Sequence, residues 1–169
     1  MQDKEIRTLA LNPGSRYVGI AVFHGLELVD WAVRSIREKS PEARLDQLKS
    51  ILSEIAKTQG VNCLVIKRLH PARSSEYLRQ LAGSLREWAK DNHHASREYT
   101  IKEVEAFLLL SERGNKQRLM EEVAARYPFL YPELENERRN RNPYLVRMFE
   151  AIALGMVCAG NLEKNRGRK

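Results

Sequence analysis

Short apolar runs separated by turn residues dominate the first part of the chain. Residues 7–11 and 17–23 are rich in apolar residues, and residues 27–36 alternate between apolar and polar positions. Pro13-Gly14-Ser15 and His24-Gly25 separate these runs, and loops this short join neighbouring antiparallel strands. The pattern predicts an antiparallel meander of three strands at the start of the fold.

The apolar spacing changes after residue 40, where a helix is expected. Ser40 precedes Pro41 and Glu42, which together supply an N-cap, a proline suited to the first turn and an acidic residue beside the positive end of the helix dipole. Leucine, isoleucine and alanine then recur at helical spacing as far as Gly60, a residue type that commonly ends helices.

Helices and strands alternate over the rest of the chain. Residues 63–66 are typical of a buried strand, and residues 74–92 of an amphipathic helix with leucines on one stripe. A fifth short strand is expected over residues 97–100. Further helices are expected over residues 101–110 and 116–127 and from Asn142-Pro143 onward, with a charged, proline-containing loop over residues 128–142.

This order of elements predicts an α/β fold. A meander followed by alternating helices and strands gives a mixed five-stranded sheet, whose first three strands are the antiparallel meander, with helices on both faces. The chain shows no internal repeat and no domain boundary, so residues 1–163 are expected to form one domain. Residues 164–169 are basic and are expected to be a disordered tail.

The composition is that of a globular protein with a basic surface. Of the 169 residues, 43% are hydrophobic and 30% are charged, which excludes a wholly disordered chain. The apolar run over residues 151–159 is about half as long as a membrane span, and the charged N-terminus lacks a signal core. No membrane partner is therefore expected, and the expected location is cytoplasmic. The net charge of +7 favours polyanionic partners such as nucleic acids.

The cysteines and histidines do not suggest a metal site. Cys63 and Cys158 lie inside apolar runs, which favours buried free thiols. The four histidines show no paired spacing with cysteine, so a structural zinc site is not expected.

The most specific motif of the chain is Asn12-Pro13-Gly14-Ser15, followed by Gly19 inside the second apolar strand. Leu64-Val65-Ile66-Lys67, Gly114-Asn115-Lys116-Gln117 and Glu150-Ala151-Ile152-Ala153-Leu154 follow it in order. Together with the order of elements, these segments resemble the RuvC-like Holliday-junction resolvases and their YqgF-type relatives in the RNase H-like superfamily. The resemblance extends over most of residues 5–160 and implies an RNase H-like fold.

The resemblance also implies where an active site would lie. The family places carboxylates on the first strand, at the end of the middle strand and on the last helix, where they hold two Mg²⁺ ions for cleavage. This chain has Asn12, Lys67, Arg147 and Glu150 at those positions. Two of the changes reverse the charge, so the resemblance implies a catalytically inactive module that needs no metal or other cofactor.

Two arrangements of these residues stay open. Lys67, Glu150 and Arg147 could form a closed network, because a buried carboxylate must be paired. Alternatively, the two cations could bind a phosphate directly, in place of metal. The Asn12 segment could also be an ordinary hairpin turn, held by Asn12 and Ser15.

Basic residues around these positions are the candidates for contact with nucleic acid. Several fall at the predicted edge of the cleft, although runs of charge are also typical of solvated surfaces. The expected function is therefore binding of structured DNA or RNA through a basic face, without cleavage. The predicted contact residues are Ser15, Arg16, Lys67, Arg68, Arg73, Lys116, Arg118 and Arg147.

Two alternative functions also stay open. The first is an active Mg²⁺-dependent endodeoxyribonuclease whose metal ligands have moved. The candidate replacement ligands are Asp30, Glu103, Glu105 and the loop residues Glu133, Glu135 and Glu137. The second is a scaffold domain that binds protein. Because the family resolvases are homodimers, the resemblance implies a homodimer through the helix over residues 74–92. Exposure of Leu78, Leu81 or Leu85 in the monomer would support this dimer.

Overall fold

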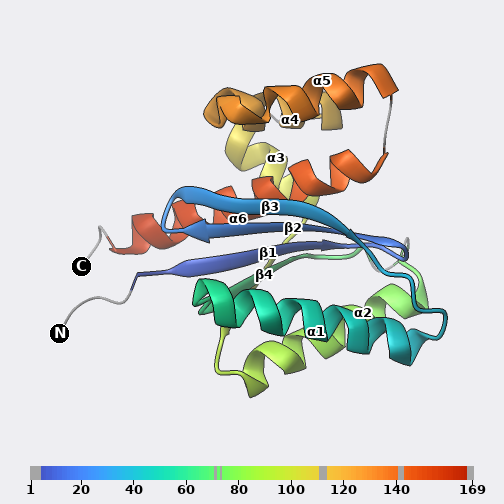
Figure 1. The fold of residues 1–169 in the computed structure, drawn as a ribbon. Coiled ribbons are helices and arrows are strands. Elements are labelled where there is room, and N and C mark those ends of the chain that lie inside the picture. Colours follow the sequence, from blue (N-terminus) through green and yellow to red (C-terminus); the bar gives the residue numbers. More distant parts are fainter. Residues whose placement is uncertain (1–4, 71, 73, 111–113, 141–142, 167–169) are drawn as a thin grey trace.

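A five-stranded mixed sheet forms the centre of the molecule. The computed structural model describes residues 5–70, 72, 74–110, 114–140 and 143–166 (Figure 1). The strand order is β3-β2-β1-β4-β5, in which β1, β2 and β3 pair antiparallel and β4 pairs parallel with both β1 and β5. The predicted fold class is confirmed. The strands are β1 (Arg7–Pro13), β2 (Tyr17–His24), β3 (Glu27–Ser35), β4 (Cys63–Lys67) and β5 (Ala95–Tyr99).

Helices cover both faces of this sheet (Figure 1). On one face lie α1 (Pro41–Gln59) and α2 (Glu76–Asp91). On the other face lies α6 (Pro143–Arg166), which crosses the first four strands. The helices α3 (Ile101–Leu109), α4 (Lys116–Arg126) and α5 (Tyr131–Asn140) form a further layer outside α6.

The alternation of side chains along the central strands explains the two cores. Leu9 and Leu11 of β1 belong to the core under α1 and α2, whereas Ala10 belongs to the core under α6. Successive residues of a strand point to opposite faces, so a strand covered on both sides is apolar throughout. Small residues on the α6 face bring the helix close. A Cβ added at Gly19 would overlap the backbone carbonyl of Arg147, which shows that the backbones of β2 and α6 are in contact.

The predicted ends of the first helix are confirmed at the level of single hydrogen bonds. The Ser40 side chain accepts a hydrogen bond from the backbone N–H of Ala43 at 3.1 Å, and Pro41 occupies the first turn. Gly60 has a φ of 66°, the left-handed conformation that ends helices at low cost for glycine.

The predicted loop over residues 128–142 is wrong where the structure describes it. A 3-10 turn, η1 (Pro128–Leu130), leads directly into α5. Leu130 and Leu134 are fully buried, four residues apart, and this one pair of apolar side chains fixes an otherwise polar helix against the outer core. The prolines begin the turns instead of breaking them, because proline is tolerated in the first turn of a helix.

The last helix is longer than the sequence predicts. It continues through Arg166, so the prediction of a disordered tail from residue 164 is wrong as far as Arg166, and residues 167–169 lie outside the described residues. The window Leu145–Leu162 is long and apolar enough to cross a membrane by composition, but 72% of it is buried inside the protein. This burial is that of a core helix packed between a sheet and an outer layer of helices.

Candidate functional site

The four positions compared with the nuclease family meet at one edge of the sheet. β1 and β4 run parallel, and Leu11 is the register partner of Ile66, so Asn12 and Lys67 follow as neighbours at the ends of the two strands. Asn12 points to the α6 face, as Ala10 does two residues earlier. On α6, Arg147 and Glu150 lie about one turn apart and face the same edge.

Glu150 is the centre of this site. Its Oε2 atom lies 2.8 Å from Lys67 Nζ and accepts a second hydrogen bond from Asn12 Nδ2 at 3.0 Å. The Glu150 side chain is only 5% exposed, whereas the Lys67 side chain is 27% exposed. A carboxylate removed from water in this way requires a cation and hydrogen-bond donors. Lys67 and Asn12 therefore neutralise and hold the one acidic group of the site.

Arg147 occupies a different place from the one expected in a closed network. Within the described part of the chain, Glu150 pairs with Lys67 and not with Arg147. The guanidinium of Arg147 instead lies against Gly14, where an added Cβ would overlap Nη1 and Cζ of the arginine. The predicted third member of the network is therefore wrong, and Asn12 takes that role. The reason is that Gly14 has no side chain and leaves room for the guanidinium above the turn.

The turn after β1 is not held by the Asn12 side chain. Asn12 is 2% exposed and donates to Glu150 and, at 3.4 Å, to the backbone carbonyl of Arg147. Its amide thus ties β1 to α6 across the sheet, and Ser15 is exposed to solvent. The prediction that Asn12 serves only the local turn is wrong, because its amide lies over the sheet face that α6 covers.

Several of the predicted nucleic-acid contacts lie together at this edge. Arg16 is exposed in the turn between β1 and β2, and Arg68 directly follows Lys67 at the end of β4. Arg68 pairs with Glu98 at 3.9 Å and with Glu103 at 3.6 Å. The structure therefore brings together five of the predicted residues at one end of the sheet: Ser15, Arg16, Lys67, Arg68 and Arg147.

The remaining predicted contacts lie at the start of α4 or outside the residues that the structure describes. Lys116 and Arg118 begin α4, which packs on α6 in the outer helical layer. Arg73 lies outside the described residues. Contact of Lys116, Arg118 and Arg73 with nucleic acid stays a prediction.

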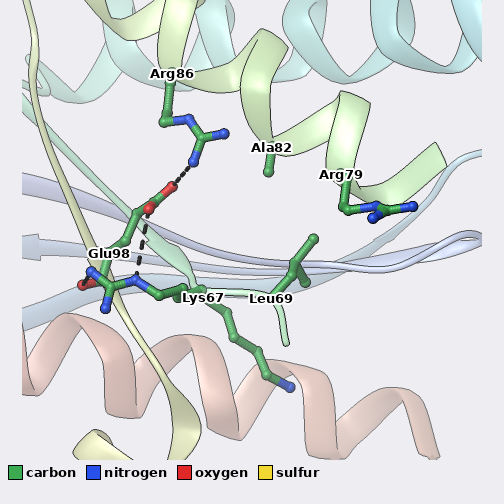
Figure 2. A pocket seen from close by; sticks show the side chains of 7 residues that line it. Lys67, Leu69, Arg79, Ala82, Arg86 and Glu98 are labelled. Atoms are coloured by element: carbon green, nitrogen blue, oxygen red, sulfur yellow. Dashed lines mark hydrogen bonds and ion pairs between the residues drawn. The ribbon is translucent and has the colours of Figure 1, made fainter. Parts of the chain in front are cut away.

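A basic pocket of about 230 Å³ opens beside Lys67 (Figure 2). Its wall includes Arg68 and two arginines from α2, Arg79 and Arg86, and Glu98 accepts from Arg86 at 2.6 Å. Glu98 therefore pairs with both Arg68 and Arg86, and Figure 2 shows Arg86 pointing toward Glu98 and the Lys67 side chain turned toward α6. Sequence reasoning missed both α2 arginines. Their spacing of two helical turns on the polar side of the leucine stripe was the signal that could have found them.

The donor set does not fit the two Mg²⁺ ions that the fold family implies. Mg²⁺ needs anionic oxygen ligands, and the family positions supply one carboxylate, already paired with an ammonium group. The described residues contain no group of three or more His, Cys, Asp or Glu side chains that could hold a metal ion. Glu103, one candidate replacement, caps α3 with Thr100, and Asp30 is an exposed residue of β3. No step of a reaction is therefore assigned to metal at this site.

Two thiols lie in the core under α6, away from the end of β4 that carries Lys67. Cys63 of β4 and Cys158 of α6 are both free and buried, as predicted from the sequence. Their mutual hydrogen bond raises the pKa of Cys158, and burial raises it further. The same hydrogen bond lowers the pKa of Cys63. A thiol pair that shares one hydrogen bond away from solvent acts as packing, and it offers no ligand to the sheet edge.

Comparison with known proteins relates the fold to solved structures. No protein-family model and no curated protein matches the sequence. A Thermus thermophilus RuvC structure aligns with a TM-score of 0.69 at 12% identity, over 96% of this chain and 97% of the other. T. thermophilus RuvC in complex with Holliday junction substrate aligns with a TM-score of 0.64 at 13% identity, over 89% of this chain and 90% of the other.

The yeast mitochondrial Holliday junction resolvase Ydc2 gives a third alignment. Its TM-score is 0.60 at 11% identity, over 96% of this chain and 82% of the other. These alignments span nearly the whole chain and agree with the strand order of the sheet. Identities this low establish shape without establishing activity. The chain therefore has a RuvC-like, RNase H-like fold.

Proposed function

We propose that this chain binds structured nucleic acid through the basic edge of its sheet and does not cleave it. The observation that carries the proposal is the 2.8 Å ion pair between Lys67 and Glu150. Glu150 is the one carboxylate among the four positions compared with the nuclease family, and the ammonium group of Lys67 neutralises it. The likeness in fold to a RuvC solved with a junction substrate supports the choice of ligand.

The ion pair argues against metal-dependent cleavage on physical grounds. A divalent cation at Glu150 would have to displace Lys67 or lie beside it, and like charges a few ångströms apart repel strongly in a partly buried site. The amide of Asn12 could offer one neutral oxygen, but two ions need several anionic ligands. Lys67 and Asn12 of the same chain therefore already satisfy the carboxylate of Glu150.

The basic groups around the ion pair support phosphate binding. Arg16, Arg68 and Arg147 come from three separate elements and reach the same edge, in a chain with a net charge of +7. Arginine presents a planar fork of donors that matches phosphate oxygens. Contacts of this kind hold a nucleic-acid backbone without reading its sequence.

Binding of a four-way DNA junction, followed by fluorescence anisotropy over a range of salt concentrations, tests the proposal. The logarithm of affinity should fall linearly with the logarithm of salt concentration. Arg68→Ala should reduce the slope by about 0.9, as expected for one lost phosphate contact. Arg126→Ala is the matched control, because it also removes an exposed arginine paired with a glutamate. No binding to junction, duplex or single strand at low salt would refute the proposal.

Incubation of the same junction with Mg²⁺ or Mn²⁺ tests the absence of cleavage. We expect the junction to stay intact with both the wild type and Glu150→Gln. Robust cleavage by the wild type that Glu150→Gln abolishes would instead support the active-nuclease alternative.

A protein partner is the second candidate, and exposed aromatic residues favour it. The rings of Trp31 and Phe129 lie 4.9 Å apart, and Phe129 and Tyr131 are 50% and 47% exposed. Large exposed aromatic side chains in one neighbourhood are characteristic of interaction surfaces. Light scattering coupled to size-exclusion chromatography would show self-association, and Phe129→Ser should weaken it if this surface is used.

The leucines whose exposure would support a homodimer through α2 are not available on its surface. Leu81 and Leu85 are buried in the core of the same chain, and Leu78 is partly buried against it. A dimer therefore has to use the polar side of α2 or another surface. The homodimer itself stays a prediction, and the mass in solution tests it.

A further inference from the structure

A second basic hollow lies at the same end of the sheet, on the side of β2 and β3. It is a groove of about 460 Å³ lined by Arg16, Tyr17, Ser35, Ile36, Arg37 and Arg44. β2 begins and β3 ends here, since Tyr17 is the register partner of Ser35. The lining residues supply three guanidinium groups and no carboxylate. Such a surface attracts an anion with more than one negative charge.

Backbone hydrogen bonds fix the segments that carry these arginines. The N–H of Ile36 donates to the carbonyl of Arg16 at 2.7 Å, which ties the turn after β1 to the end of β3. The N–H of Arg37 donates to Gln47 Oε1 at 3.2 Å. Arg44 Nε donates to the carbonyl of Glu38 at 2.8 Å, which orients its side chain from α1. The backbone at Arg16 and Arg37 and the side chain of Arg44 are thus held in place, which reduces the entropy that a ligand would lose in ordering them.

An aromatic side chain stands beside the cations. Tyr17 is 41% exposed, and the buried Ile36 forms an apolar part of the lining. Cationic grooves with an accessible ring suit single-stranded nucleic acids, because phosphates contact the cations while an unpaired base stacks on the ring. A paired base cannot do this, since its faces are already covered within the duplex.

We propose that this groove binds an unpaired nucleic-acid strand, with phosphates at the arginines and one base stacked on Tyr17. The inference rests on the proposed function, because it extends the basic edge to a strand that leaves a paired region. The basic residues around Lys67 could contact paired and unpaired strands alike, whereas this groove would select an unpaired strand. The neighbouring Arg34 serves a different hollow, which it shares with Asp30 and Glu54.

Affinities for two DNA duplexes test this inference, one blunt and one with a protruding oligothymidine arm. An oligouridine arm on the same duplex shows whether RNA is accepted equally. The wild type should bind the tailed duplex roughly tenfold more tightly than the blunt one, the typical effect of one stacked base. Tyr17→Ser and Arg37→Ala should each remove most of this gain and leave blunt-duplex affinity unchanged. Arg37→Ala should also lower the salt slope for the tailed duplex by about 0.7.

Two further variants serve as controls. Tyr17→Phe keeps a stacking ring and should keep the gain from the tail. Arg34→Ala removes the same charge from the neighbouring part of β3 and should also keep it. Thermal melting of each variant verifies that the fold is intact.

The outcomes separate this inference from the proposed function. If the wild type binds the blunt duplex and the tail adds nothing, the strand site is refuted and nucleic-acid binding stands. The same holds if the gain survives both Tyr17→Ser and Arg37→Ala. If the wild type binds neither duplex nor junction, both proposals fail together.

Discussion

At the scale of single residues, the exposure of Lys67 and Glu150 is unequal, and this has a measurable consequence. Lys67→Met leaves Glu150 buried beside one amide donor, which should cost about 3–5 kcal/mol, the usual effect of stranding a buried charge. Glu150→Gln leaves Lys67 free to turn toward water and should cost about 1–3 kcal/mol. Urea denaturation at neutral pH compares the two. Equal losses in the free energy of unfolding for the two variants would show that Glu150 is more exposed to solvent than in this structure.

A second prediction at this scale concerns His94, which packs against Trp88 with ring centroids 5.4 Å apart. Burial lowers the pKa of His94 below 6.5, and the neighbouring charge of His93 lowers it further. The folded protein therefore favours the neutral form of His94 over the protonated form. Its contribution to stability is complete above pH 6.5 and is lost as the pH falls through the folded-state pKa.

The free energy of unfolding, measured from pH 7.5 to lower values, tests this sign. His94→Gln should flatten the decline relative to the wild type. His70→Gln, at an exposed position, is the control and should leave the decline unchanged. A steeper decline in His94→Gln would contradict the assignment.

Residue chemistry also explains how much of the site the sequence could predict. The resemblance located Asn12, Lys67 and Glu150 correctly as neighbours, because residue identity and element order determine which strand or helix carries each of them. It did not locate the guanidinium of Arg147. That position depends on the space above Gly14, which is a property of backbone packing and not of the charge pattern.

At the scale of elements, the close contact between β2 and α6 is the most demanding packing in the fold. Gly19→Ala should destabilise the protein by about 1–3 kcal/mol or more, because the new methyl group overlaps the Arg147 carbonyl. Since Arg147 borders the site, the substitution should also displace the start of α6. Chemical denaturation measures the loss.

Gly83→Ala provides the matched control for this substitution. Gly83 lies within α2, and an added Cβ there would only approach the Arg86 side chain at 3.8 Å. Alanine favours a helix over glycine by about 1 kcal/mol, so this variant should be neutral or more stable. A similar loss in both variants would indicate that the effect of Gly19→Ala is not specific to the contact with α6.

The elements show where sequence patterns suffice and where they do not. The first four strands, α1 and α2 have apolar periods of clear length and strong end signals, so their predicted bounds are nearly correct. The polar edge strand β5 was predicted over residues 97–100 and lies over Ala95–Tyr99. The helix α5 has mostly charged residues, and it is fixed by Leu134, by Leu130 just before it, and by Arg138 pairing with Glu121 and Glu135. A helix held by tertiary contacts leaves a weak signal in its own sequence.

At the scale of the whole molecule, the sheet order predicts an uneven stability. β1 is hydrogen-bonded on both sides, by β2 and β4, and its central residues are buried from both faces. β5 is an edge strand whose first residues are exposed. Backbone amides of β1 should therefore exchange with deuterium far more slowly than those of β5. Hydrogen exchange followed by mass spectrometry tests this order, and equal protection of the two strands would contradict it.

The two basic hollows lie at the same end of the sheet. The pocket beside α2 and the groove beside β3 lie on either side of Lys67 and Glu150, and arginines line both. A duplex contacting the centre of this edge would have a basic surface at each side for the strands that leave it. This arrangement suits branched or tailed nucleic acid better than an uninterrupted duplex.

The place of α6 in the chain has a consequence for synthesis. It covers four of the five strands on one face of the sheet, yet it follows every other described helix and strand. While the chain emerges from the ribosome, Ala21, Phe23 and Val65 therefore stay uncovered until α6 has been made. A nascent chain interrupted before Pro143 would present this apolar face to chaperones and proteases.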